Sequence, residues 1–543
     1  GLSEARPFIV ILVLLGFPLA LALAWAYEVR PETPAPQGGA PGPQDGASGP
    51  QGGMGPVAEP GAEAGAEPRG GPGESHGARS VAVLPFESMS SDPEDDYFAD
   101  GMAEELINTL AREEGLRVVA RTSAFVFRDQ AMDIREIGRR LNVSHVIEGS
   151  VRRTRDALRI TAQLISTEDG YHVWSERFDR SRGDVFQIQE EIARCVLRRL
   201  LRSEEGGKEG LQPSVPTADL SAYESYLRAR HAMTRFDPRA VQEAIDDFET
   251  AIQQDDQFAP ALSGLAEALT VQSIGFSDRP VRETMPRAEE AADRAVELDP
   301  RLPEAHLARA LARMYRHWDY AGAKQELDRA LELNPNFAEA HLWQEFYWTY
   351  VEHDREKALA SNRRAHRLSP LDHRIQDRFG TVLYIFGEFE RAETVYKQAL
   401  KENPQNPLTH LGLGDTLGRM GRIGEALAHV EEAVRLGGRA HAFLGMLGGL
   451  YAARGKKAAA EAILEELETR QRAEYAPAFW VAVVRASLGR VDDAFRSLDR
   501  AVEERDSNLL FLFVLPRRLG LHQDPRFDTL MERIGLGHLV PLK

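Results

Sequence analysis

A 34-residue period in the second half of the chain limits its fold more than any other feature. Glycines recur at this interval, at Gly387, Gly421, Gly455 and Gly489. An alanine follows each glycine after five residues, and a large apolar residue follows each alanine after four: Ala392, Ala426, Ala460, Ala494, then Tyr396, Val430, Leu464, Leu498. Small residues at a fixed phase let two helices approach closely, and glycine lets the chain turn between them. The period therefore predicts stacked helical hairpins.

The same phase extends toward the amino terminus. Further alanines continue it, at Ala358, Ala323, Ala288 and Ala244, and Asp-Pro or Asn-Pro often closes a repeat, at Pro300, Pro335 and Pro404. This pattern resembles the tetratricopeptide repeat, a helix–turn–helix unit of 34 residues. About eight units are expected over residues 220–506, with an insertion of about ten residues in the second unit. Residues 507–543 are expected to cap the last unit.

The first thirty residues contain an uncharged apolar run. Pro7–Tyr27 carries no charged side chain, and about twenty such residues can cross a bilayer as a helix. Residues 1–30 are therefore predicted to form a single transmembrane helix that anchors the chain in a membrane. Arg6 before the run and alanines at Ala22, Ala24 and Ala26 keep a cleaved signal peptide open as an alternative, and a buried core helix is a third possibility.

Residues 31–79 are predicted to be a disordered linker. About half of them are Gly or Pro, and such a segment buries too little apolar surface to offset the entropy lost on ordering. The linker separates the predicted membrane helix from the folded part of the chain.

Residues 80–205 read as an α/β domain with a mixed sheet. Strands are expected over five stretches: Val81–Phe86, Leu116–Ala120, His145–Arg152, Leu158–Ile165 and His172–Phe178. Helices are expected over Tyr97–Arg112, Ile134–Leu141 and Val185–Leu200. The last three strands alternate apolar and polar residues and are separated by short polar turns, which predicts an antiparallel meander.

Several stretches of this domain resemble a known family. "SVAVLPF", "YFADGMAEELINTLAR", "DIREIGRRLNVSHVIEGSVRR" and "RITAQLISTEDGYHVWSERFDR" occur in order, and the tail carries "LHQDPRFDTLMERIGL". Together they resemble the TolB-like amino-terminal domain that is fused to tetratricopeptide repeats in membrane-anchored bacterial signalling proteins. In that family a nucleotide cyclase, a protein kinase or a winged-helix DNA-binding domain often precedes the membrane span. The resemblance implies a single-pass protein of the bacterial inner membrane whose folded domains are periplasmic.

The sequence contains no recognisable catalytic motif. The acidic loop Asp92–Asp96 has neither the glycines nor the lysine of a phosphate loop and lacks calcium-loop spacing, so we expect it to begin a helix. The single cysteine, Cys195, shares a helical face with apolar residues, and His306 and His341 recur with the repeat. We therefore predict no catalytic residues, no cofactor and no metal site. A nucleotide or small-molecule site in the α/β domain is a weaker alternative.

The net charge of the chain limits the kinds of molecule that it can bind. The formal net charge is -18, and a strongly acidic surface repels phosphate backbones. Nucleic-acid binding by this chain is not expected, and no small-molecule substrate is expected either.

Large side chains on the first helices of the repeats are candidate contacts for a partner. Trp343, Tyr347 and Tyr350 fall at i, i+4 and i+7 of one helix. Related positions in neighbouring repeats carry Tyr315, Tyr384 and Arg419. By repeat phase these six side chains point into a concave groove, and aromatic residues and arginine are common interface anchors. The alternative is that they only pack between repeats.

The sequence as a whole predicts a membrane-tethered scaffold for protein–protein interaction. A TolB-like domain would dock onto another component or onto the first repeat, and the groove would bind a protein or peptide. The alternative is that these residues form the sensory and regulatory half of a signalling protein whose cyclase, kinase or DNA-binding domain lies upstream.

Overall fold

The computed structural model describes residues 79–90, 93–128, 130–154, 157–181, 184–201, 217, 219–235, 237–275, 279–473, 475–515 and 519–540. The predicted anchor Pro7–Tyr27 and, apart from Arg79, the predicted linker lie outside these residues. Among the helices that are described, none is both long and apolar enough to cross a bilayer.

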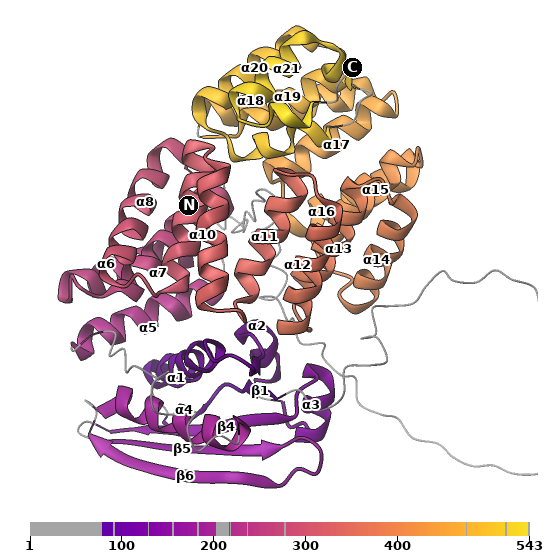
Figure 1. The fold of residues 1–543 in the computed structure, drawn as a ribbon. Helices are drawn as coiled ribbons and strands as arrows, with labels where there is room; N and C mark the ends of the chain where they lie inside the picture. Colours follow the sequence, from indigo (N-terminus) through magenta and orange to yellow (C-terminus); the bar gives the residue numbers. More distant parts are fainter. Residues whose placement is uncertain are drawn as a thin grey trace, which may run out of the picture. The chain divides into compact units, whose positions relative to one another are not determined.

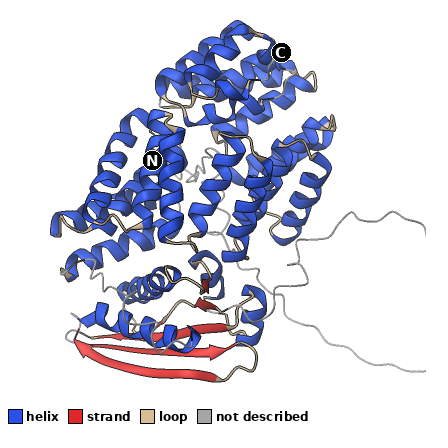
Figure 2. Ribbon diagram, viewed as in Figure 1, coloured by secondary structure: helices blue, strands red, loops and turns tan. Residues whose placement is uncertain are grey.

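A mixed sheet forms near the start of the described residues, as the sequence predicts (Figure 2). Its strands are β1 (Ser80–Val83), β2 (Glu87–Ser88), β3 (Arg117–Val118), β4 (His145–Arg153), β5 (Ala157–Ser166) and β6 (His172–Ser181). The order is β3-β1-β4-β5-β6, with β2 also beside β4. β1 is parallel to β3 and β4, whereas β4, β5 and β6 form the predicted antiparallel meander.

Helices of the same segment cover the apolar face of this sheet. They are α1 (Pro93–Ala111), α2 (Arg121–Ala124), the 3-10 turn η2 (Phe125–Phe127), α3 (Ile134–Leu141) and α4 (Val185–Leu201). Alternate residues of β5, from Leu158 to Leu164, are buried in the core. The short helix α2 was not predicted from the sequence. Asp95 and Asp96 of the acidic loop lie in the first turn of α1.

Sixteen helices follow in eight antiparallel hairpins within the described residues (Figure 1). They are α5 (Leu220–Arg235), α6 (Pro238–Gln254), α7 (Ala259–Thr270), α8 (Val281–Leu298), α9 (Pro303–Ala312), α10 (Tyr320–Leu333), α11 (Ala338–Tyr350), α12 (Arg355–Leu368), α13 (His373–Ile385), α14 (Phe389–Glu402), α15 (Pro407–Arg419), α16 (Ile423–Gly437), α17 (His441–Ala453), α18 (Lys457–Ala473), α19 (Ala478–Ser487) and α20 (Val491–Glu504). Turns of π-helix, η4 (Val271–Gly275) and η5 (Arg313–His317), extend α7 and α9.

The turns inside the hairpins are of two kinds. In earlier hairpins an aspartate caps the second helix: Asp237 of α6 and Asp354 of α12 each accept a backbone N–H three residues on. In the last four hairpins the turn holds the periodic glycines, whose φ angles lie near +80°, at Gly387, Gly421, Gly455 and Gly489. Only glycine adopts this left-handed conformation without strain, which explains the 34-residue spacing of glycine.

The α/β domain docks onto the repeats at several places, from α5 to the residues between α12 and α13. Gly101 of α1 faces Leu227 of α5 so closely that a Cβ atom there would lie 2.3 Å from the leucine side chain. Farther along, Asn336 Nδ2, just before α11, donates to the carbonyl oxygens of Ala111 and Leu116, each at 2.9 Å. The domain therefore contacts the first hairpin, one of the two sites that the sequence analysis considered, and later hairpins as well.

The chain after α20 turns back onto the middle of the repeats. It forms η6 (Ser507–Val514), η8 (Leu521–Gln523), α21 (Pro525–Arg533) and η9 (Gly537–Leu539). The hydroxyl of Tyr320, the first residue of α10, donates to the carbonyl oxygen of Ile534 at 2.8 Å. His538 Nε2 lies 2.7 Å from the carbonyl oxygen of Val351, at the end of α11. This returning segment covers inner faces of hairpins far from it in sequence.

Candidate functional site

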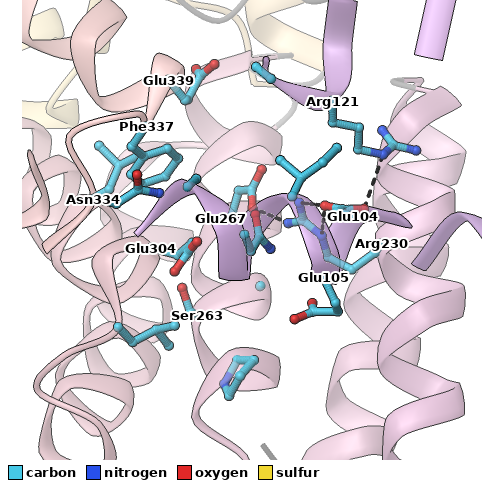
Figure 3. A pocket seen from close by; sticks show the side chains of 18 of the residues that line it. Glu104, Glu105, Arg121, Arg230, Ser263, Glu267, Glu304, Asn334, Phe337 and Glu339 are labelled. Carbon is cyan, nitrogen blue, oxygen red and sulfur yellow. Dashed lines mark hydrogen bonds and ion pairs between the residues drawn. The ribbon is translucent and has the colours of Figure 1, made fainter. Parts of the chain in front are cut away.

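A cavity of about 1380 Å³ lies between the α/β domain and the repeats. Residues of α1 and α2 line one side, and residues of the first helices α5, α7, α9, α11 and α13 line the other. The first helices of successive hairpins form the inner face of a solenoid. The cavity is therefore the part of this inner face that the docked α/β domain does not fill (Figure 3).

A buried ion-pair network occupies one wall of the cavity. Glu104 of α1 is 7 % exposed and accepts from Arg230 Nε of α5 at 3.1 Å, while Arg121 Nε of α2 lies 3.2 Å from its other oxygen. Arg230 also donates to Glu267 of α7 at 2.8 Å. Burial alone would raise the pKa of Glu104, but Arg230 and Arg121 hold it below its usual value. The network fixes α1 and α2 on the repeats.

Glu105, the next residue of α1, is in a different electrostatic environment. The Tyr226 hydroxyl donates to it at 3.2 Å. Burial raises the pKa of Glu105 to about 7, and the negative charges of Glu104 and Glu304 add to the effect. The side chain of Glu105 therefore carries a partial charge near neutral pH.

The carboxylate of Glu304 on α9 has one oxygen that accepts no hydrogen bond from the described residues. Its Oε2 atom is buried and has no hydrogen-bond partner among the described residues. Ser263 of α7 is 4 % exposed and lines the same cavity, and no described residue is hydrogen-bonded to its hydroxyl. Figure 3 shows the Ser263 hydroxyl and the Glu304 carboxylate turned toward one another inside the cavity. Two polar groups of residues that line the cavity thus have no hydrogen-bond partner among the described residues.

A second ion-pair group lines the cavity at α11 and α13. Arg374 of α13 lies 2.8 Å from an oxygen of Asp372 and 3.2 Å from Glu339 Oε2 of α11. Burial raises the pKa of Glu339, although Arg374 opposes the shift. These side chains satisfy one another, unlike Glu304.

The aromatic residues singled out by the sequence are buried, and three of them form one cluster. The ring centroids of Tyr315 and Trp343 are 6.2 Å apart, and Phe346 connects Trp343 to Tyr350 at 5.6 and 4.5 Å. Each of the three is 1 % exposed. Phe511 of the returning segment packs on Tyr350 at 5.0 Å. Only Trp343 of these three also lines the cavity.

The other three predicted residues lie outside this cluster. Arg419 stacks over Tyr384, with 5.5 Å between the guanidinium carbon and the ring centroid, and its Nη2 donates to the carbonyl oxygen of Val514 at 3.2 Å. Tyr347 instead faces Trp348 and donates to Glu352 at 2.8 Å. The chain's own residues 507–515 thus cover the groove over Tyr350 and Arg419, and partner binding by these six residues stays a prediction.

Sequence reasoning missed the polar residues of the cavity, although one signal was present. Glu304 and Glu339 precede His306 and His341 in the matching stretches "EAHLA" and "EAHLW". The histidines have structural contacts: His306 is bonded to Glu326 and the carbonyl oxygen of Pro300, and His341 to that of Pro335. The repeated glutamates, not the histidines, face the cavity. Glu104, Glu105 and Arg121 show no periodic signal, because they belong to the docked domain.

The cavity suits recognition of a ligand better than a metal ion. Within the described residues, no group of three His, Cys, Asp or Glu side chains is placed to hold a metal. Its walls combine apolar side chains, such as Leu307 and Trp343, with a few polar groups. That composition is typical of binding sites.

Comparisons with known protein families match three parts of the chain. Residues 77–195 match a model described as the second domain of HilA/YgeH-like transcriptional regulators. Residues 380–421 match a TPR repeat model, and residues 411–477 match a tetratricopeptide repeat model. The carboxyl-terminal half of the chain contains tetratricopeptide repeats, as the sequence predicts.

One curated relative matches across part of the chain. It is "Putative adenylate cyclase 3" of Rhizobium meliloti (strain 1021), 36 % identical over 233 residues. The match covers 43 % of this chain and 40 % of the relative, so the chain spans well under half of that protein's length.

Two solved structures contain helical hairpins similar to those of this chain, although their sequence identity to it is low. Pseudomonas aeruginosa pilF is 19 % identical with a TM-score of 0.30, over 38 % of this chain and 90 % of its own. Yeast Tom70 is 15 % identical with a TM-score of 0.38, over 64 % of this chain and 77 % of its own. The family models and the fold together show tetratricopeptide repeats in the carboxyl-terminal part of the chain, with a small mixed α/β domain before the helical hairpins.

Proposed function

We propose that this chain is a non-catalytic interaction protein that holds a segment of another protein in the cavity between α1 and the first helices of its repeats. The observation that carries the proposal is the cavity itself. Its volume of about 1380 Å³ exceeds the range of about 300–1,000 Å³ that is common for small-molecule sites, so it suits several residues of a polypeptide.

The α/β domain has a supporting part in this proposal. As a TolB-like docking domain it closes one side of the groove, so a bound segment touches both α1 and the repeats. Pro7–Tyr27 would anchor the chain in the bacterial inner membrane, with the folded domains in the periplasm. Extraction of membranes with alkaline carbonate tests the anchor, because an integral protein stays in the pellet and a peripheral one is released.

A peptide selection tests the binding function. A random peptide library displayed on phage would be selected on the purified full chain. Selected peptides should bind poorly to Glu267→Trp, which places a large ring at the cavity wall in place of a half-exposed carboxylate. The matched control is Gln253→Trp on the exposed face of α6, which should bind normally. Equal binding to both variants would count against the cavity as the site.

A second candidate function is that of a regulatory half of a longer signalling protein. The matched relative is named a putative adenylate cyclase, and the matched model is the second domain of a transcriptional regulator. Both names indicate proteins with a separate output domain. An antibody against the repeats tests this in the source organism: a band well above 60.4 kDa favours a longer protein, and a band near that mass counts against it.

A further inference from the structure

The cavity carries more carboxylates than arginines. Ten aspartate and glutamate side chains line it, against five arginines and no lysine. A concave site with an excess of one charge attracts ligands of the opposite charge, because low-dielectric walls focus the field. The excess of carboxylates alone does not locate a binding site. The position of a bound cation depends on which carboxylates already have an arginine partner.

Three arginines are already engaged by carboxylates. Arg121 and Arg230 pair with Glu104, and Arg230 also pairs with Glu267. Arg374 pairs with Asp372 and Glu339. None of these ion pairs includes Glu304 or Glu105, although the charges of Arg112 and Arg230 act on Glu105 from a distance.

We propose that the segment bound in the cavity presents a lysine or arginine side chain whose cationic group lies at Glu304 and Ser263, facing Glu105. This inference rests on the proposed binding function and adds the chemistry of the ligand. Glu304 Oε2 is a buried acceptor without a donor, and the Ser263 hydroxyl, which lines the same cavity, has no described partner. An ammonium or guanidinium group would supply the missing donors.

Electrostatics favour a cation at this position. Burial raises the pKa of Glu105, and the nearby negative charges of Glu104 and Glu304 add to the shift. A cation placed between Glu105 and Glu304 relieves this repulsion and lowers the pKa of Glu105. An ordinary metal ion fits less well, because the described residues offer no third ligand in reach. A flexible cationic side chain needs fewer fixed ligands than a metal ion.

The selected peptides test the inference through their composition and their dependence on Glu304. Peptides should be enriched in lysine or arginine, and acetylation of the lysine in one of them should weaken binding at least tenfold. Glu304→Gln should weaken binding by a similar factor, because it keeps the size of the side chain and removes the charge. Glu297→Gln on α8 removes the same charge from an exposed position and should change affinity less than twofold.

The outcomes separate this inference from the binding function. Peptides without basic residues that still lose affinity for Glu267→Trp would overturn the inference and leave the binding function standing. Basic peptides that bind Glu304→Gln and Glu297→Gln equally would overturn the inference too, because their attraction would then come from the overall charge. A library that yields no enriched peptide would overturn both. Thermal melting of each variant shows that it is folded.

Discussion

Arg378 of α13 and Glu345 of α11 form a doubly bonded ion pair that is sealed from solvent. Both contacts, Nε to Oε2 and Nη2 to Oε1, are 2.7 Å long, and the two side chains are 1 % and 0 % exposed. The rings of Phe346 and Tyr350 lie 5.6 Å from the guanidinium carbon. The pair therefore joins two neighbouring hairpins inside the aromatic cluster.

Loss of one member of this pair should destabilise the protein strongly. Arg378→Ala leaves the carboxylate of Glu345 buried without its cation, which costs about 3–5 kcal/mol. Chemical denaturation of the full chain measures this free energy of unfolding. Arg294→Ala, which breaks an exposed pair with Glu297, should cost less than about 1 kcal/mol. A loss below that value for Arg378→Ala would contradict the expected role of the buried pair.

Asp377, beside Arg378 in sequence, should make stability depend on pH. It is 1 % exposed and accepts from Thr409 Oγ1 at 2.7 Å and Asn406 Nδ2 at 2.9 Å. Burial raises its pKa to about 7 in the folded state. Its contribution to stability is therefore full below about pH 4, the unfolded pKa, and declines as the pH rises through 7.

The expected loss between pH 5 and pH 8 is about 2–3 kcal/mol. Asp377→Asn keeps the shape of the side chain and should remove this part of the pH dependence, as urea denaturation at the two pH values would show. Asp256→Asn, at an exposed site, should keep the pH dependence of the unmodified chain. A pH profile for Asp377→Asn that matches the unmodified chain would rule out Asp377 as its source.

Asn336 should hold the α/β domain on the repeats. Asn336→Ala leaves the buried carbonyl oxygens of Ala111 and Leu116 without their donor, at a cost of about 2–4 kcal/mol. Hydrogen exchange should speed up across residues 111–117. Gln405 takes the equivalent place in a later repeat and is exposed, so Gln405→Ala is the matched control. Equal exchange in the two variants would show that the domain is held by other contacts.

Phe511 of the returning segment should stabilise the aromatic cluster by packing on Phe346 and Tyr350. Phe511→Ala removes a ring that packs on both Phe346 and Tyr350, and truncation of a buried phenylalanine costs about 3–5 kcal/mol. The tryptophan emission of the chain should shift to longer wavelength as water reaches Trp343, one of its six tryptophans. Tyr171→Ala removes a side chain that is 74 % exposed and should change neither quantity. An unchanged emission spectrum in Phe511→Ala would mean that the segment does not shield the cluster.

The repeats could be predicted because their cause is local and periodic. Ala392, Ala426, Ala460 and Ala494 are all 0 % exposed at the contact between paired helices, so the same constraint recurs every 34 residues. The mixed sheet followed from alternation along β4, β5 and β6. The 34-residue period and the alternation along the strands both depend on residues that are close together in sequence.

The candidate site could not be predicted in the same way. Its walls combine Glu105 of α1 with Glu304 of α9, and about two hundred residues separate them in sequence. The cover over Tyr350 comes from Phe511, which is about 160 residues away in sequence. Such contacts are set by how whole elements pack, and no local period records them. Repeat phase therefore predicted that aromatic side chains lie on inner helices, but not what would cover them.

The return of the last residues onto α10 and α11 has a consequence for how this protein can change. Solenoids commonly gain or lose whole units, because each unit touches only its neighbours. Here two hydrogen bonds, from Tyr320 to Ile534 and from His538 to Val351, connect the end of the chain to α10 and α11 across the intervening hairpins. Duplication of one 34-residue unit between α12 and α19 would move the end of the chain away from α10 and α11 and break both hydrogen bonds. These contacts therefore constrain the number of units in this stretch.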